Sequence, residues 1–285
     1  HNMTLHEILQ LLRIKERESG YLLNFALSLK RFREKSNIQI LRPSDAFYLP
    51  AVNSKARIKW GGIFIRETFN FFEVAGEDDG PHEPIFLVTI ADKSHVTTDQ
   101  PQQINVKRIK RKLGAGLRGL SYIGMIEPGY YNVIYDEIGK QRKNVVSWHG
   151  HFLVWGITEE QLAKHLAKIK SRFTPIMRGL CAVHKKIIPR DQFGYKLWYV
   201  LKSPCKEYSI GRRRECDEKT GMARFRQNSR KIRHGNRVRL YHLMHGMYLD
   251  QLALAGGEGR ELLRRIKYEA LREYRIKNGR DDRRP

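Results

Sequence analysis

The chain has 285 residues, and its 54 lysines and arginines against 30 aspartates and glutamates give a formal net charge of +24 at pH 7. So large an excess favours a polyanionic partner, nucleic acid before an anionic membrane surface. No apolar run approaches the roughly 18 residues of a membrane span, and no Gly-x-x-x-x-Gly-Lys-[Ser/Thr] loop is present. We therefore expect a cytoplasmic protein without a membrane segment, an ATPase module or a helicase module.

The first third of the chain predicts helices and one hairpin. His1-Asn2-Met3 is interpreted as a tag remnant and takes no part in the fold. Apolar residues recur at helical spacing over 4–35, with Gly20 as a candidate break. Residues 63–65 and 69–74 predict two strands of a hairpin, and the acidic stretch 76–84 predicts an exposed loop.

The middle of the chain predicts the sheet. Apolar runs typical of strands occur at 85–90, at 122–127 with 131–135 as an extension, and at 145–155. Residues 105–120 predict a basic amphipathic helix, and 139–143 a polar loop. Thr158 and Gln161 form a capping box that predicts a helix from about Glu159 to Arg172.

The last third predicts helices around a basic segment. A helix is expected over 191–202, stopped by Pro204. The segment 207–236 is dense in Arg and Lys and predicts a mobile basic loop, and 238–255 and 260–277 predict two helices, with a frayed end after Gly279. These two helices form either a plain helical hairpin on the core or a DNA-binding helix-turn-helix.

Together these elements predict an α+β fold, with a central antiparallel sheet of about five strands flanked by helices. The expected organisation is a tag remnant (1–3), an N-terminal helical extension (4–45), a core (46–205), a basic loop (206–237) and a C-terminal helical region (238–285). Cys181, Cys205 and Cys216 are expected to be reduced thiols; a zinc site with His184 is the alternative.

The stretch His149-Gly150-His151 lies within the apolar strand 145–155. Residues i and i+2 of a strand point to one face, so two imidazoles project side by side from a buried element. A shared divalent metal is the favoured explanation, and a packed, hydrogen-bonded pair is the alternative. Glu127, at the end of the preceding strand, is the expected third ligand, with a salt bridge as its alternative role and Asp92 or His95 as rival ligands. Two imidazoles and a carboxylate suit Mn²⁺ or Mg²⁺.

Downstream, Tyr195, Tyr199 and Lys202 lie at helical spacing on one face of the helix 191–202. A phenol is a poor nucleophile at neutral pH, but it becomes useful where a metal polarises the electrophile and a cation favours phenolate. For Tyr195 the alternative is an aromatic side chain packed on the core, and Tyr199 has the same alternative.

The order of these motifs resembles the HUH endonuclease superfamily, in particular its rolling-circle replication initiators. The resemblance covers about 85–202 and rests on the apolar strand Phe86-Leu87-Val88-Thr89-Ile90, on His149-Gly150-His151 and on Tyr199-Val200-Leu201-Lys202. It departs from the family at Gly150, where members carry a bulky apolar residue. Glycine there indicates a close backbone neighbour or a chance pair of histidines.

The resemblance implies an HUH nuclease-like fold and metal-dependent nicking and rejoining of single-stranded or hairpin DNA at a replication origin. Tyr199 would form a 5′-phosphotyrosine link, Tyr195 would serve as a second tyrosine, and Lys202 would neutralise charge. His149, His151 and Glu127 would hold the metal. A host helicase and polymerase are the further partners. Phosphate contacts are expected from a basic set comprising Arg212, Arg213, Arg214, Arg224, Arg226, Arg230 and Lys231.

Three alternatives remain open from the sequence. A transposase or a relaxase of the same superfamily would use the same chemistry. A hydrolytic metal-dependent nuclease would use water instead of Tyr199. A noncatalytic nucleic-acid-binding protein would use the basic residues and leave the histidine pair with a structural role.

Overall fold

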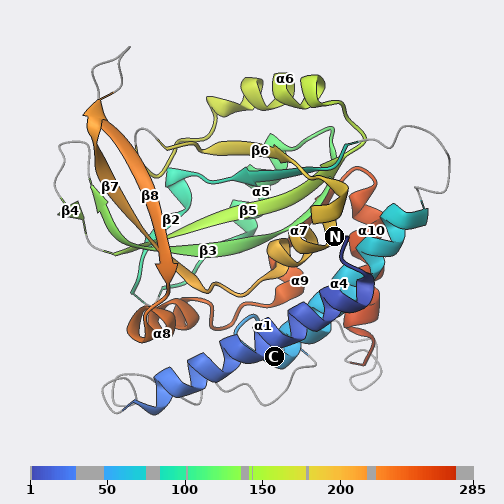
Figure 1. Cartoon of the computed structure of the whole chain (residues 1–285), viewed down its shortest axis with the longest axis horizontal. Helices are drawn as coiled ribbons and strands as arrows, with labels where there is room; N and C mark the ends of the chain where they lie inside the picture. The colour runs from blue at the N-terminus through green and yellow to red at the C-terminus, as the bar shows by residue number, and fades with distance from the viewer. Residues whose placement is uncertain are drawn as a thin grey trace.

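The computed structural model describes residues 2–29, 48–74, 84–100, 102–135, 141–142, 144–177, 180–216 and 223–273. Within these ranges the chain is mixed α+β, with a curled, open sheet flanked by helices (Figure 1). The predicted class is therefore confirmed. In the described part of the chain, no helix is long and apolar enough to cross a membrane.

The sheet is larger than the sequence predicts. Its main path runs in the order β6 (Val183–Ile187), β1 (Phe86–Ile90), β5 (Val145–Trp155), β3 (Ser121–Tyr135), β7 (Lys206–Cys216) and β8 (Ala223–Lys231). Short strands add to it: β2 (Val96–Thr98) on β5, β4 (Gln141–Arg142) on β3, and β9 (Ala253–Gly256) on β3. The described pairs are antiparallel, except that β3 and β7 run parallel.

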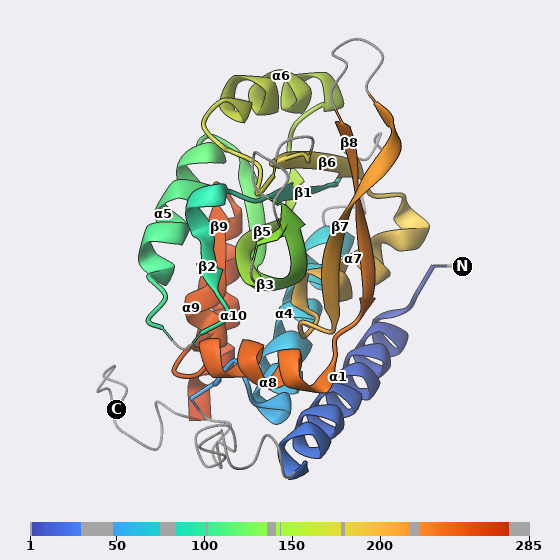
Figure 2. The ribbon, with the colours of Figure 1, turned by 90° about the vertical axis from the view of Figure 1, so that its left-hand side faces the viewer.

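Helices cover both faces of the sheet (Figure 2). They are α1 (Leu5–Ser28), α4 (Ser54–Val74), α5 (Val106–Gly116), α6 (Glu159–Lys170), α7 (Phe193–Leu201), α8 (His234–Leu243), α9 (Leu249–Leu252) and α10 (Gly259–Ala270). Single 3₁₀ turns occur at Lys93–His95 and Arg190–Gln192. Buried side chains of α1, α4, α5, α7 and α10 join the strands in one main hydrophobic core.

The expected hairpin over 63–74 is wrong, because these residues belong to the helix α4. Its buried residues recur every four positions, at Ala56, Trp60, Phe64 and Thr68, which is the spacing of one helix face. The aromatic residues that suggested strands instead pack between helices: Phe69 and Phe72 contact Phe193 of α7. Packing of this apolar face outweighs the β-propensity of its residues.

The expected basic loop over 207–236 is also wrong, because most of it forms the hairpin β7–β8. The strand signal is weak since charged residues are frequent in both strands and apolar anchors are few. Tyr208 and Ile210 provide these anchors on β7, and Phe225 on β8.

The expected helix 238–255 is shorter and begins earlier. The helix α8 ends at Leu243, Gly246 has a positive φ of 78° that breaks the helix, and β9 pairs with β3. A strand therefore separates α8 and α9 from α10, which contradicts both the plain helical hairpin and the helix-turn-helix.

Most other expected elements are present. Those over 85–90, 105–120, 122–135, 145–155 and 191–202 lie within one to four residues of β1, α5, β3, β5 and α7. The capping box of α6 is confirmed at Thr158 and Gln161. Gly20 does not break α1. The end of the first predicted helix, most of the acidic loop, part of the polar loop and the chain end lie outside the described residues.

Candidate metal centre

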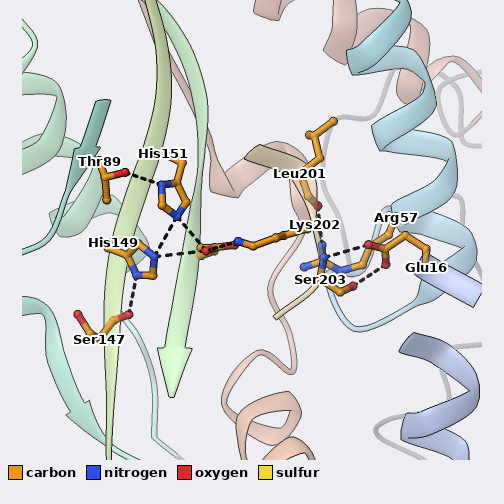
Figure 3. A network of polar contacts seen from close by, with 10 residues as sticks. Glu16, Arg57, Thr89, Ser147, His149, His151, Leu201, Lys202 and Ser203 are labelled. Atoms are coloured by element: carbon orange, nitrogen blue, oxygen red, sulfur yellow. Dashed lines mark hydrogen bonds and ion pairs between the residues drawn. The ribbon is translucent and has the colours of Figure 1, made fainter. Parts of the chain in front are cut away.

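Strand register places the two histidines and Glu127 on one face of the sheet. Glu127 of β3 lies directly opposite His149 of β5, and Thr89 of β1 lies opposite His151. Side chains alternate along each strand, so His149 and His151 project together. Figure 3 shows the His149 and His151 rings close together, with the amine of Lys202 directed toward them.

The three expected ligands converge on one point. The His151 Nε2 lies 3.0 Å and the His149 Nε2 lies 3.3 Å from the same Glu127 oxygen, Oε1. The two Nε2 atoms are 3.2 Å apart. Among the described residues, these three side chains form the one His, Cys, Asp and Glu group arranged closely enough to hold a metal ion.

Hydrogen bonds behind the rings fix which nitrogen faces this point. The His149 Nδ1 lies 3.1 Å from the Ser147 carbonyl oxygen. A carbonyl only accepts, so Nδ1–H donates and a neutral His149 offers its Nε2 lone pair to the cluster. The His151 Nδ1 lies 2.8 Å from the Thr89 hydroxyl, which can accept the same kind of bond. Such outer contacts orient metal-bound histidines in general.

Charges in the cluster are balanced by Lys202. Its Nζ donates to both Glu127 oxygens, at 2.7 and 2.9 Å. Burial raises the pKa of Glu127, but Lys202 and the histidines lower it more, and the net pKa is well below 4.5. Burial lowers the pKa of Lys202, but Glu127 outweighs this and raises the net pKa above 10.5. Burial lowers the pKa of His151 to about 4, against the opposing effect of Glu127, so this ring is neutral at pH 7.

This donor set fits a divalent cation. A carboxylate oxygen and up to two imidazole lone pairs meet within hydrogen-bonding distance, and the carboxylate remains ionised. Such a mixed set suits Mn²⁺ and Mg²⁺ and leaves coordination positions for phosphate oxygens and water.

The rival ligands lie elsewhere. Asp92 bonds the amine of Lys112 at 2.8 Å and the backbone of Ser94 and Thr174. His95 is buried, with no partner on either ring nitrogen among the described residues. Glu127 is thus the carboxylate that the sheet brings to the histidines.

The helix α7 brings Tyr199 to the same cluster. The Tyr199 ring lies 5.1 Å from the His151 ring, and the Lys202 amine lies 4.1 Å from the centre of the Tyr199 ring. Burial raises the pKa of the Tyr199 phenol above 10, although Lys202 lowers it. Lys202 thus lies against the ring face and is ion-paired with Glu127.

Tyr195 lies one turn earlier and is 44 % exposed. Its ring packs against Trp198 at 5.3 Å. The Lys196 amine lies 5.3 Å from the ring centre of Tyr195 and 5.8 Å from that of Tyr199. The two phenols therefore share a neighbouring cation.

The end of α7 is held by buried groups that the sequence did not single out. Glu16 of α1 accepts bonds from the Ser203 backbone nitrogen at 2.9 Å and from its hydroxyl at 2.5 Å. Arg57 of α4 donates to the Leu201 carbonyl at 3.3 Å. These bonds flank Lys202 on both sides (Figure 3). No local sequence signal marks Glu16, because its partner lies 187 residues away.

Gly150 faces away from the metal ligands, toward α5. A Cβ at this position would lie 2.4 Å from the Phe152 ring and 3.2 Å from Leu113. The close neighbour is therefore a side chain, and not the backbone neighbour that was one of the two expected explanations. The aromatic ring of Phe152 fills the space that a bulky residue at 150 would occupy.

The predicted phosphate-contacting residues lie on the β7–β8 hairpin. Arg226, Arg230 and Lys231 are exposed on β8, and Arg230 is paired with buried Glu207 at 2.6 Å. Arg212, Arg213, Arg214 and Arg224 belong to the same two strands, but their side chains lie outside the described part. Cys181 and Cys205 are free thiols outside the metal group, and the Cys216 side chain is not described.

Comparison with known proteins gives no relative. No family model matches the chain, and neither a curated protein nor a solved structure matches it. The resemblance to the HUH superfamily therefore rests on the sequence motifs alone.

Proposed function

We propose that the protein nicks and rejoins single-stranded DNA at a specific site through a 5′-phosphotyrosine intermediate, and so initiates rolling-circle replication of a plasmid or virus. The observation that supports this best is the convergence of His149, His151 and Glu127 beside the ring of Tyr199. Strand and helix elements separated in the sequence supply these groups to one place.

In the proposed reaction the Tyr199 oxygen attacks the scissile phosphorus, and the 3′ oxygen leaves to become a free hydroxyl. His149, His151 and Glu127 would hold Mn²⁺ or Mg²⁺, which polarises and orients the phosphate when bound. Tyr199 has to lose its proton, and the nearby Lys202 charge favours the phenolate. The phosphodiester energy is kept in the new link, so rejoining needs no ATP.

Tyr195 is the proposed second tyrosine, because its exposed phenol lies on the same helix face as Tyr199. A transposase or relaxase would use the same groups. A host polymerase would extend the freed 3′ end. A host helicase would assist it, since no nucleotide-binding loop is present in this sequence.

One observation favours the noncatalytic alternative. Lys202 already satisfies both oxygens of Glu127, as a structural ion pair would. A protein that only binds nucleic acid would keep this pair, and its histidines would complete a hydrogen-bonded cluster.

Cleavage assays on single-stranded and hairpin DNA separate the candidates. The proposal predicts metal-dependent cleavage that is lost in Tyr199→Phe and in His151→Ala, with DNA binding retained in Tyr199→Phe. Cleavage that survives Tyr199→Phe and fails in His151→Ala would indicate a hydrolytic nuclease. Binding without cleavage by the wild type, across a library of origin-like hairpins, would favour the noncatalytic protein.

A further inference from the structure

The helix α8 begins where the chain leaves β8 (Figure 2), and residues at this junction line a basic hollow. It has a volume of about 780 Å³, and the metal ligands are not among its lining residues. The residues that line it include four cations, Lys231, Arg233, Arg237 and Arg239, and no carboxylate.

Three of these cations already have acidic partners: Arg233 with Glu207 at 2.9 Å, Arg239 with Asp99 at 3.1 Å and Lys231 with Glu18 at 3.6 Å. Arg237 differs from them. Its side chain is 1 % exposed, and within the described chain its polar contact is one bond of 3.4 Å to the Ser19 hydroxyl. The Arg237 Nε has no hydrogen-bond partner there.

A guanidinium carries five N–H donors and remains charged. Burying it without a counter-charge is costly unless an anion completes its bonds. Arg237 therefore lines the hollow with an unsatisfied positive charge.

The backbone at the same place favours an anion independently. The first intrahelical bond of α8 runs from the Arg237 nitrogen to the Arg233 carbonyl, at 2.9 Å. The N–H groups of His234, Gly235 and Asn236 precede it and have no intrahelical acceptor. No side chain caps the N–H groups of the first turn, which has no acidic residue, although the buried Glu207 carboxylate accepts a bond from the preceding Arg233 N–H at 3.2 Å. Cations at a helix N-terminus oppose the helix dipole, and a bound anion offsets them.

We propose that this hollow binds a backbone phosphate of the nucleic-acid strand, held by Arg237 and by the N-terminal N–H groups of α8. Phosphate matches a guanidinium fork and a set of N–H donors together. Arg226 and Arg230 are exposed on β8, the strand that directly precedes α8 in the chain. The site shares the nucleic-acid partner with the proposed function but does not depend on cleavage. Its test therefore uses Tyr199→Phe protein without metal.

Two substitutions remove the two kinds of donor. Arg237→Gln removes the buried charge. His234→Pro removes one backbone donor and should preserve the helix, because proline is favoured at the first helical position. Arg233 already has φ −69° and ψ 152°, which suits a residue before proline. The matched controls are His234→Ala, which keeps the N–H, and Arg172→Gln, which removes one exposed charge elsewhere.

Two probes are titrated, inorganic phosphate by thermal unfolding and a short fluorescent DNA strand by anisotropy at several salt concentrations. We expect phosphate to stabilise the parent and both controls, and to stabilise Arg237→Gln and His234→Pro less. DNA affinity should fall about 10-fold in Arg237→Gln, as loss of a charge-assisted bond predicts. The slope of log affinity against log salt should fall by about 0.7.

Unchanged phosphate and DNA binding in folded Arg237→Gln would overturn the proposal. A loss of phosphate binding with unchanged DNA binding would also overturn it, because the site would then serve free phosphate. Should Arg237→Gln fail to fold, His234→Pro against His234→Ala decides the question, and equal binding by these two variants would refute the site.

Discussion

Ser147 determines which nitrogen His149 presents to the candidate metal centre, and Thr89 contacts the far nitrogen of the His151 ring. The Ser147 carbonyl compels the His149 Nδ1 to donate. The Thr89 hydroxyl leaves the choice for His151 open until a cation binds. A cation at Nε2 requires the proton on Nδ1, and the Thr89 hydroxyl oxygen then accepts a hydrogen bond from that Nδ1–H.

Thr89→Val removes this acceptor and keeps the shape of the side chain. We expect Mn²⁺ affinity to fall about 10-fold or more, as loss of an outer hydrogen bond to a metal-bound histidine does. Calorimetric titration of Mn²⁺ measures it, with Thr89→Ser as the control that keeps the hydroxyl. Equal affinity in Thr89→Val and wild type would argue against the assigned tautomer.

Lys202 stabilises the cluster when no cation is bound, because it neutralises buried Glu127. In Lys202→Met the carboxylate lacks its lysine, so in EDTA the free energy of unfolding should fall by about 3 kcal/mol. Mn²⁺ should restore much of this loss, since a cation replaces the ammonium. Denaturant unfolding with EDTA and with Mn²⁺ measures both values, and a loss that is equal in the two conditions would count against a cation site.

The candidate metal ligands could be predicted from the sequence, because the spacing of the two histidines fixes their face once the strand is recognised. Glu127 is proposed from its place at the end of an expected strand over 122–127, but β3 continues to Tyr135 and Glu127 lies within it. The orienting roles of Ser147 and Thr89 depend on strand register, and the contact of Glu16 with Ser203 joins distant helices. No local pattern carries either kind of information.

Among the elements, β5 carries ligands on one face and core residues on the other. Gly150 lies between the two histidines, against the Phe152 ring. This packing explains how a glycine occupies a position where a bulky residue was expected.

Gly150→Ala should lower the free energy of unfolding by about 1–3 kcal/mol, because the new methyl group overpacks the core. In a Phe152→Leu background the same change should cost less, since the two residues are in contact. A double-mutant cycle by chemical denaturation measures the coupling. Additive effects would show that the Phe152 ring does not limit the size of the side chain at position 150.

The hairpin β7–β8 is joined to α8 through Glu207. This fully buried carboxylate accepts bonds from Asn132, Arg230 and Asn236 at 3.0, 2.6 and 2.6 Å. Burial raises its pKa, but Asn236, Arg230 and Arg233 lower it more, so the folded pKa lies below 4.5.

A depressed folded pKa stabilises the protein above the unfolded value and loses that contribution as pH falls through the folded value. Glu207→Gln should therefore be less stable than wild type at neutral pH, with the difference shrinking below pH about 4.5. Unfolding midpoints between neutral and acidic pH measure this. A difference that stays constant through the acidic range would contradict the assigned ion pairs.

At α4 and at β7–β8 the local composition favours a different element from the one that the fold contains. Aromatic residues in α4 suggested strands when short windows were considered, whereas its period of four appears only over the whole segment 54–74. In β7–β8 the solvent-facing charges hid the alternation of Tyr208 and Ile210. A long structureless segment inside a compact fold is uncommon, and this base rate argues against a loop over all of 207–236.

For the molecule as a whole, the N-terminal helix belongs to the same core as the sheet. Leu12 and Leu27 of α1 are buried in the main cluster, and Glu16 fixes the segment that follows Tyr199. The sequence left open whether this region binds DNA, dimerises or covers the sheet. The structure shows that α1 packs on α4, α7 and α8.

The net charge of +24 is large, and two basic regions, the β7–β8 hairpin and the hollow at the start of α8, lie outside the candidate metal centre. We expect most of the DNA contact there, so substitutions should be able to change DNA binding and cleavage independently. Substitutions at the metal ligands should stop the reaction, and salt should weaken binding in every variant.

In the proposed reaction Tyr199 becomes covalently linked to DNA, and this link can be detected directly. Oligonucleotides labelled at the 3′ end are incubated with protein and Mn²⁺ and resolved on a denaturing protein gel, with Tyr195→Phe, Tyr199→Phe and EDTA samples alongside. The proposed reaction should give a labelled protein band that requires Mn²⁺, persists in Tyr195→Phe and disappears in Tyr199→Phe. Cleaved DNA without labelled protein, or a labelled band that persists in Tyr199→Phe, would contradict it.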